Sequence, residues 1–460
     1  MKMRKIMMIL LAAMLVFITA CSGGKQEAGG SSKEPAGTTA DGTKEKEITI
    51  SYWVDPRFKL VQGLEDQTKE YGDWEKLQAA EFTKLHPNVK IEVQALTWDD
   101  LGKKVPISIT AQTNPDILRD YLGRTSQYAH QGVLENLEDL VPKEELDDYL
   151  PDYLDLYTIN GHLHALPSFA WTLGLVINKE LWKQKGKESM IPTPDNPYWT
   201  IDQFDQAIRE VADKGKVPFS VIVATAQGDT GLLSFFWGFG AKLFKESDYS
   251  KVALNSPEGV KALEYLVKLN DDGLIQPSAV SMQAGDMDTL FTTGTVGAYG
   301  GQLGLWKTIE NSKKEGKTKA EFDLTMVQFP SDGDVKNGVA VGPTGLAIFK
   351  QEDEYKRKMV VEFANFLNST QYQKDYAINA GQFPVKKSAG IPMAEDPNYK
   401  VLQKIIDERG VEDMGLTNPK YAEIRALLQP EIQAALLKQK TPAQALQDYE
   451  TAANKVLSEK

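Results

Sequence analysis

Strand and helix patterns alternate in the first folded part of the chain, and this alternation limits the folds open to it. Apolar and polar residues alternate in 48–53 and 89–93, which predicts two strands. Apolar residues recur at helical spacing in 74–85, and a second helix is expected over 98–112. A short strand follows at 117–118. This order, with short turns, predicts an α/β unit with a mostly parallel sheet.

The same alternation continues to the C-terminus. Further strands are expected at 163–167, 174–178, 297–299, 324–329 and 345–349. One further helix is expected after the capping box of Thr200 and Gln203, and others at 257–271, 287–291 and 354–367. The C-terminal region of about 50 residues is also expected to be helical, with Thr441 as the N-cap of one helix. The folded part has about 410 residues, enough for two lobes that each build a core.

The N-terminus has the layout of a secretory signal. Residues 1–5 are basic, and residues 6–20 are apolar or small apart from one threonine. An apolar run of about 15 residues is shorter than the ~20 of a membrane-spanning helix. Residues 18–21, Ile-Thr-Ala-Cys, resemble the lipobox of bacterial lipoproteins. The resemblance implies a signal peptide over 1–20 and a lipid on Cys21; the alternative is an ordinary signal peptide with a chance cysteine.

Residues 21–46 contain no large apolar side chain. Such a segment cannot bury enough surface to offset the entropy lost on ordering. We therefore expect a flexible linker, with folded sequence from about residue 47.

Composition and motifs exclude several classes of function. The net charge of −12 argues against a nucleic-acid partner, because phosphate binding needs a basic face. His162 and His164 would share one face of a strand, but no further ligand lies at a metal spacing. The chain has no nucleophile elbow, phosphate-binding loop or dinucleotide fingerprint. We therefore expect no cofactor, no metal and no catalytic residues, although paired glycosidase carboxylates would have no distinguishing signature here.

Four of the eight tryptophans lie where the chain is expected to turn: Trp53, Trp171, Trp237 and Trp306. Open α/β sheets bind ligands at strand ends, and an indole face can stack on the apolar C–H face of a sugar. Nearby polar residues could bind the hydroxyl groups: Asp55, Arg119, Asp120 and Gln302. The alternative is that some of the four pack in the core. Trp98, by contrast, is expected at a helix start, as a packing or surface residue.

Several short motifs, in this order and spacing, resemble the extracellular solute-binding proteins of bacterial ABC importers. The resemblance covers most of residues 47–460 and is to the carbohydrate-binding group, family 1, typified by maltodextrin-binding protein. The motifs are F-x-x-x-H-P-x-V-x-I-x-V from Phe82, N-P-D-I from Asn114, G-V-L-x-x-L from Gly132, N-G-H-L-H-A-L-P from Asn160, L-V-I-N-K-E-L from Leu175, and F-x-x-G-x-x-G-A from Phe291 with Trp306.

The resemblance implies an α/β, two-lobed periplasmic-binding-protein-like fold with a hinge and a ligand cleft between the lobes. One lobe would hold 47–165 and 337–380, and the other 168–333 and 384–460. The sugar site implied by residue matches and turn positions comprises Trp53, Asp55, Arg119, Asp120, Trp171, Trp237, Trp306 and Phe383. The chain departs from the family pattern in a longer first loop, 58–73, which could reshape the pocket.

The function implied is capture of a sugar or oligosaccharide for an ABC permease by a monomer without catalytic activity. A lipid on Cys21 would hold the protein at the outer face of the cell membrane. A Gram-positive cell would require such an anchor, because it has no outer membrane to retain a free receptor. Arg57, Arg119 and Arg124 near the expected cleft also leave an acidic oligosaccharide such as a uronate open. The sequence is also compatible with a binder of peptides or small solutes of another kind, and with a surface glycoside hydrolase.

Overall fold

Three parallel strands open the described part of the chain, as the alternating pattern predicts. The computed structural model describes residues 46–459 except 214, 246, 247 and 319. The expected signal peptide, Cys21 and nearly all of the linker lie outside the described residues. β1 (Ile48–Val54) pairs in parallel with both β2 (Val89–Ala95) and β3 (Ile117–Tyr121). Two helices connect them, α1 (Asp73–Leu85) and α2 (Trp98–Thr110).

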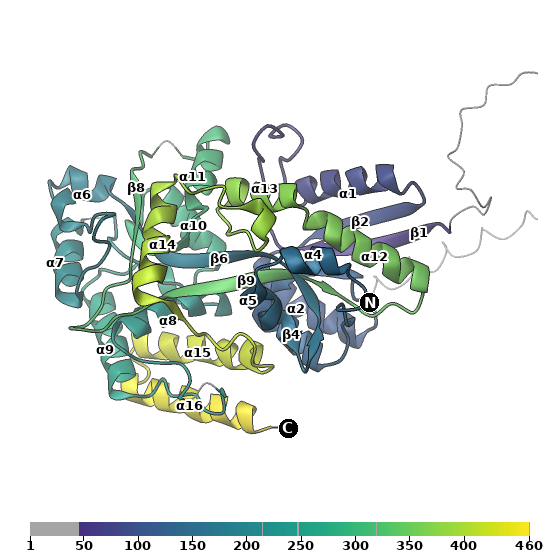
Figure 1. The fold of residues 1–460 in the computed structure, drawn as a ribbon. Coiled ribbons are helices and arrows are strands. Elements are labelled where there is room, and N and C mark those ends of the chain that lie inside the picture. The colour runs from purple at the N-terminus through teal and green to yellow at the C-terminus, as the bar shows by residue number, and fades with distance from the viewer. Residues whose placement is uncertain (1–45, 214, 246–247, 319, 460) are drawn as a thin grey trace, which may run out of the picture. The chain divides into compact units, whose positions relative to one another are not determined.

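Two long strands extend this sheet into the rest of the molecule. β6 (Ala165–Asn178) and β9 (Val339–Ile348) are antiparallel neighbours in a sheet of order β2-β1-β3-β9-β6-β7. The last residues of β9 pair with β3, while the second half of β6 pairs with β7 (Ala298–Gln302) and β8 (Leu324–Val327). In Figure 1, β6 and β9 cross the centre of the drawing between two groups of helices.

The expectation of two strands separated by a turn at 168–171 is wrong. Pairing between β6 and β9 continues through this segment, from Ala165 to Leu173, with a register shift between Pro167 and Phe169. Every residue of β6 except Leu173 is buried, so the strand stays in the core rather than looping out. The expectation of a mostly parallel sheet is also wrong beyond β3, because β9, β6, β7 and β8 pair antiparallel.

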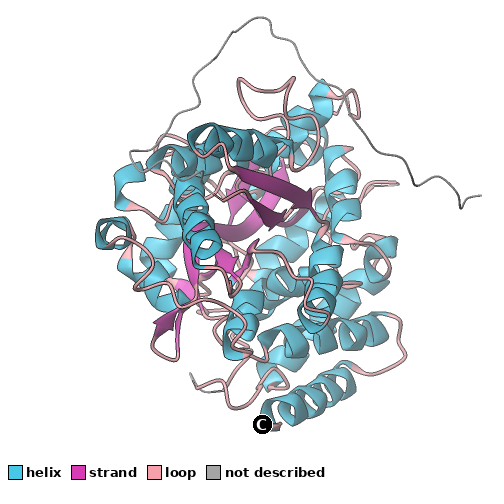
Figure 2. Ribbon diagram, turned by 90° about the vertical axis from the view of Figure 1, so that its right-hand side faces the viewer, coloured by secondary structure: helices cyan, strands magenta, loops and turns pink. Residues whose placement is uncertain are grey.

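Helices cover both sides of the strands (Figure 2). The predicted capping box of Thr200 and Gln203 is present at the start of α7 (Ile201–Val211), and Thr441 caps α16 (Pro442–Ser458). The other main helices are α3 (Leu122–His130), α8 (Asp229–Gly238), α9 (Pro257–Asp271), α10 (Ala284–Thr292), α11 (Leu305–Lys314), α12 (Glu354–Leu367), α13 (Thr370–Ala380), α14 (Pro397–Arg409) and α15 (Tyr421–Leu436). The shorter elements are α4 (Lys143–Asp148), α5 (Pro151–Tyr157), α6 (Glu180–Gln184), β4 (Thr158–Ile159), β5 (His162–Leu163) and β10 (Val411–Glu412).

None of the helices in the described part of the chain is long and apolar enough to cross a membrane.

Candidate functional site

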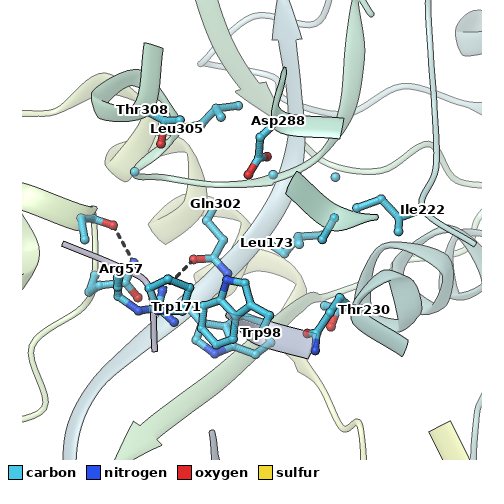
Figure 3. Close-up of a pocket in the computed structure, with 18 of the residues that line it drawn as sticks. Arg57, Trp98, Trp171, Leu173, Ile222, Thr230, Asp288, Gln302, Leu305 and Thr308 are labelled. Carbon is cyan, nitrogen blue, oxygen red and sulfur yellow. Dashed lines mark hydrogen bonds between the residues drawn. The ribbon is translucent and has the colours of Figure 1, made fainter. Parts of the chain in front are cut away.

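A cavity of about 430 Å³ lies where the long strands pass from one group of elements to the other. Its first wall comes from the loop after β1, the start of α2 and the end of β3. Its second wall comes from α8, α10, β7, α11 and residues 414–425. Trp171 and Leu173 of β6 line it between these walls (Figure 3). The cavity therefore draws on segments from both halves of the fold.

Aromatic side chains supply much of the cavity surface: Tyr71, Trp98, Tyr121, Trp171, Tyr299 and Tyr421. Trp98 is placed by the start of α2, where the hydroxyl of Thr97 accepts a hydrogen bond from the amide of Asp100 and caps the helix. The guanidinium of Arg57 lies 5.1 Å from the centre of the Trp98 ring. A flat, half-buried indole of this kind can stack on the face of a ring-shaped ligand.

Trp171 depends on a glycine in the neighbouring strand. Trp171 pairs with Gly342 of β9, and a Cβ atom at Gly342 would lie 1.9 Å from Cζ2 of the indole. Any other residue at 342 would therefore displace the Trp171 ring. The absence of a side chain on β9 is what allows the indole to lie against the strand and present itself to the cavity.

The first wall meets the second at two places. At the loop edge, residues 57–71 contact residues 302–315: Arg57 donates to the side chain of Gln302 at 3.3 Å, and Lys59 Nζ lies 2.6 Å from Glu315 Oε1. The side chain of Asn311 also donates to the carbonyl of Lys59 at 3.0 Å. All these contacts are polar, and the Lys59 and Glu315 side chains retain 17% and 24% exposure.

At the helix edge, residues 121–126 contact residues 416–425. Arg425 lies over the ring of Tyr121 at 5.2 Å and pairs with Asp229 at 2.8 Å, and Asp229 also accepts from the hydroxyl of Tyr421 at 2.6 Å. Asp229 is buried, and burial raises the pKa of Tyr421 well above its ordinary value. The hydroxyl of Ser126 donates to the carbonyl of Thr417 at 2.7 Å. The charged groups of this edge are therefore buried and paired.

A buried ionic cluster supports the loop edge. Arg119 is fully buried and is held by Asp55 at 2.5 Å and by Glu75 at 2.6 Å. Asp55 also accepts from Arg57 at 2.7 Å, which fixes the arginine that reaches Gln302. Burial alone would raise the pKa of Asp55, but Arg119 and Arg57 outweigh it and hold this pKa below its usual value. For Glu75, burial outweighs Arg119 and the pKa is raised.

Residues 65–374 match the model of the family described as bacterial extracellular solute-binding protein. The chain belongs to this family. Among its relatives, the diacetylchitobiose binding protein of Streptomyces coelicolor is 24% identical over the full length of both chains. A putative binding protein of Brucella abortus is 21% identical over 66% of this chain and 71% of its own.

Solved structures of such binding proteins share the fold. An ABC transporter solute-binding protein of Thermotoga lettingae, solved with α-D-tagatose, gives a TM-score of 0.75 at 22% identity, over 90% of this chain and all of its own. The maltotriose binding protein of Thermus thermophilus, solved with maltotriose, gives 0.71 at 20% identity, over 89% and 100%. The predicted α/β, two-lobed fold is thus confirmed.

Of the eight ligand residues predicted for this solute-binding protein, Trp171 lines the cavity and the other seven do not. Asp55 and Arg119 belong to the buried cluster, and Asp120 is buried in a two-point ion pair with Arg124. Trp237 is 1% exposed in the core.

The remaining three lie outside the lining as well. Trp53 is half-buried on β1, with Lys104 Nζ 4.7 Å from its ring. Trp306 is half-buried against the core, and Phe383 stacks on Tyr399 at 4.9 Å. A role for these seven in contacting ligand remains a prediction.

Most cavity residues escaped the sequence-based site prediction, and three of them show why. Trp98 was predicted to be a packing or surface residue, because a helix start gives an indole no sign of what it faces. Tyr71 lies in the long first loop, and that loop's departure from the family pattern was the signal that could have found it. Asp288, in α10, carried no sequence signal at all.

Proposed function

We propose that this solute-binding protein captures a sugar or oligosaccharide between its two lobes and delivers it to an ABC permease without chemical change. The observation that supports this most directly is the cavity itself. The indoles of Trp98 and Trp171, from different halves of the fold, line it near the side chain of Gln302, and Thr308 adds a further hydrogen-bonding group to the same lining (Figure 3). A mostly polar ligand with flat apolar faces, such as a sugar ring, satisfies both kinds of surface.

The lobes of the proposal keep the sequence-based boundaries, 47–165 with 337–380 and 168–333 with 384–460. Three backbone connections lie near these boundaries. Two of them are the continuous strands β6 and β9. The third is the segment between 380 and 384, where the amide and carbonyl of Phe383 form hydrogen bonds of 2.7 and 2.9 Å with the backbone of Ala170. The register shift at Pro167 to Phe169 interrupts the ladder at the crossing. Such interruptions are where strands bend, so we place the hinge there.

Ligand binding would favour the closed arrangement. The contacts of the loop edge and helix edge join the two walls, so opening the cleft has to break them. A ligand that touches both walls makes some contacts only when the cleft is closed, so it binds the closed form more tightly than the open form. This difference in affinity sets how far the ligand shifts the population toward the closed form. The closed form would be the one that docks on the permease.

The lipid anchor completes the proposal. The family is extracellular, and the lipobox-like residues 18–21 support attachment to the membrane through Cys21. A segment of small and polar residues follows, which suits a tether. A Gram-positive cell, with no outer membrane to retain a free receptor, would need such an anchor.

The experiment is a binding screen coupled to a test for turnover. The mature chain is mixed with neutral and acidic oligosaccharides, and binding is followed by the unfolding temperature and by tryptophan fluorescence. Bound sugars are then recovered and analysed by chromatography. We expect binding of at least one carbohydrate, recovered intact. Cleaved products would show an enzyme instead, and the absence of any carbohydrate binding would rule out sugar capture.

A further inference from the structure

The cations that line the cavity are all paired with carboxylates of the protein itself. Arg57 pairs with Asp55, Arg425 with Asp229, Lys307 with Glu310 at 3.0 Å, and both Lys59 and Lys317 with Glu315. Arg119 and Arg124, which the sequence placed near the cleft, are buried and paired as well. The positive charge that suggested an acidic ligand is therefore already neutralised within the protein.

Asp288 is different from the other two lining carboxylates, Asp229 and Glu315. Its Oδ1 accepts a hydrogen bond of 2.7 Å from the hydroxyl of Tyr299, and no described residue places a cation within ion-pairing distance of it. The side chain is exposed and opens to the cavity, and partial desolvation by the surrounding protein raises its pKa. Burial and the carboxylates of Asp288 and Glu315 likewise raise the pKa of Tyr71 in the first wall.

The position of Asp288 makes it a partner for the ligand. Figure 3 shows Asp288 on the opposite side of Gln302 from Trp98 and Trp171, and all four line the same cavity. A sugar chain that stacks on the indoles and extends past Gln302 would bring its next unit to Asp288. An ionised carboxylate only accepts hydrogen bonds, so that unit must offer O–H or N–H donors.

We propose that Asp288 determines the charge class of the ligand, favouring neutral or amine-bearing saccharides and rejecting uronates and other anionic sugars. The inference rests on the proposed function, because it assigns a role within the same cavity. A hydrogen bond to a charged acceptor is stronger than one to a neutral acceptor, so hydroxyl or ammonium donors gain from Asp288. A uronate carboxylate brought to the same place would meet a like charge, with no free cation in the described lining to offset it.

Calorimetric titration of matched sugars tests the proposal. The probes are the neutral oligosaccharide that binds best in the screen, and the uronate and amino-sugar oligosaccharides of the same linkage, at fixed ionic strength near pH 7. The variant is Asp288→Asn, which keeps the size of the side chain and removes its charge. The matched control is Asp66→Asn, which removes the same charge from a fully exposed position outside the cavity.

For the wild type we expect the uronate to bind at least about tenfold more weakly than the neutral sugar, and the amino sugar at least as tightly. Asp288→Asn should weaken the neutral sugar and tighten the uronate, so that the neutral-to-uronate ratio falls about tenfold, while Asp66→Asn changes neither affinity. If Asp288→Asn does not fold, Asp288→Ser takes its place, and the same fall in the neutral-to-uronate ratio is expected.

Two results would overturn the inference while leaving sugar capture intact. One is a uronate that binds the wild type as tightly as its neutral counterpart. The other is a neutral-to-uronate ratio in Asp288→Asn that matches the ratio in Asp66→Asn. If no carbohydrate binds at all, the proposed function fails and the inference fails with it.

Discussion

The two edges of the cavity join the same pair of walls with different chemistry. At the helix edge, Arg425 lies over Tyr121 of the first wall and is held in place by the buried Asp229 of its own wall. At the loop edge, Lys59 and Glu315 remain partly exposed, and the contacts between the walls are hydrogen bonds and ion pairs. Removing one partner of a buried ion pair is strongly destabilising, because the other charge stays buried without a partner. A solvent-exposed ion pair contributes little to stability, and its charged groups exchange readily with water. The helix edge should therefore stabilise the fold, and the loop edge should adjust the balance between open and closed forms.

The largest expected effect is at the helix edge. Arg425→Ala leaves Asp229 buried without its cation, and we expect a loss of about 3–5 kcal/mol in the free energy of unfolding, measured with denaturant. Arg209→Ala is the control, because Arg209 pairs with Asp205 and Asp272 at the surface and should cost at most about 1 kcal/mol. Adding Asp229→Asn to Arg425→Ala should recover part of the loss. A loss for Arg425→Ala no larger than the control's would show that the buried pair behind the helix edge does not stabilise the fold.

The next effect concerns the buried cluster beneath the loop edge. Because Arg119 and Arg57 hold the pKa of Asp55 below its usual value of about 3.9, Asp55 stabilises the fold at neutral pH, and this contribution is lost as the pH falls below that value. Asp55→Asn should lower the free energy of unfolding at pH 7 and flatten its decline toward acid. The raised pKa of Glu75 acts in the opposite sense, so Glu75→Gln should make the acid decline steeper. Parallel acid curves for the wild type and both variants would contradict these assignments.

The smallest effect is at the loop edge itself. Lys59→Ala should change the free energy of unfolding by less than about 1 kcal/mol but weaken ligand binding about two- to fivefold, since under the proposed closure the Lys59–Glu315 pair forms only in the closed cleft. Lys317→Ala is a matched control: it removes a second cavity cation that pairs with the same Glu315 from within the second wall. Added salt should reduce the affinity difference between wild type and Lys59→Ala. Equal effects of the two substitutions on affinity would show that the pair does not act in closure.

Local sequence patterns predicted the elements well, and long-range contacts explain most of what they missed. The strands and helices around α1 and α2 follow from periodicity, and the cap of α7 follows from two residues three positions apart, Thr200 and Gln203. The burial of Arg119 could not be predicted in this way, because its partners Asp55 and Glu75 lie 64 and 44 residues away in the chain. The sequence shows that charges are present, and only the fold shows which of them are already paired.

Trp171 illustrates the limit for the site. It was predicted as a ligand residue because it was expected in a turn, and it lines the cavity from a continuous strand instead. Its exposure to the cavity depends on Gly342 in β9, a partner that no local pattern identifies. Trp306 and Trp237 had similar sequence surroundings, but the fold turns them toward the core.

A comparison of two tryptophan variants tests most directly whether this cavity is the site of capture. Trp171→Ala and Trp306→Ala are each titrated by calorimetry with the oligosaccharide that binds the wild type best. We expect Trp171→Ala to lose at least about tenfold in affinity, since stacking on an aromatic ring is lost, and Trp306→Ala to stay within about twofold of the wild type. Unchanged affinity in Trp171→Ala, with a large loss in Trp306→Ala, would show that the ligand binds elsewhere and would contradict the assignment of this cavity as the site of capture.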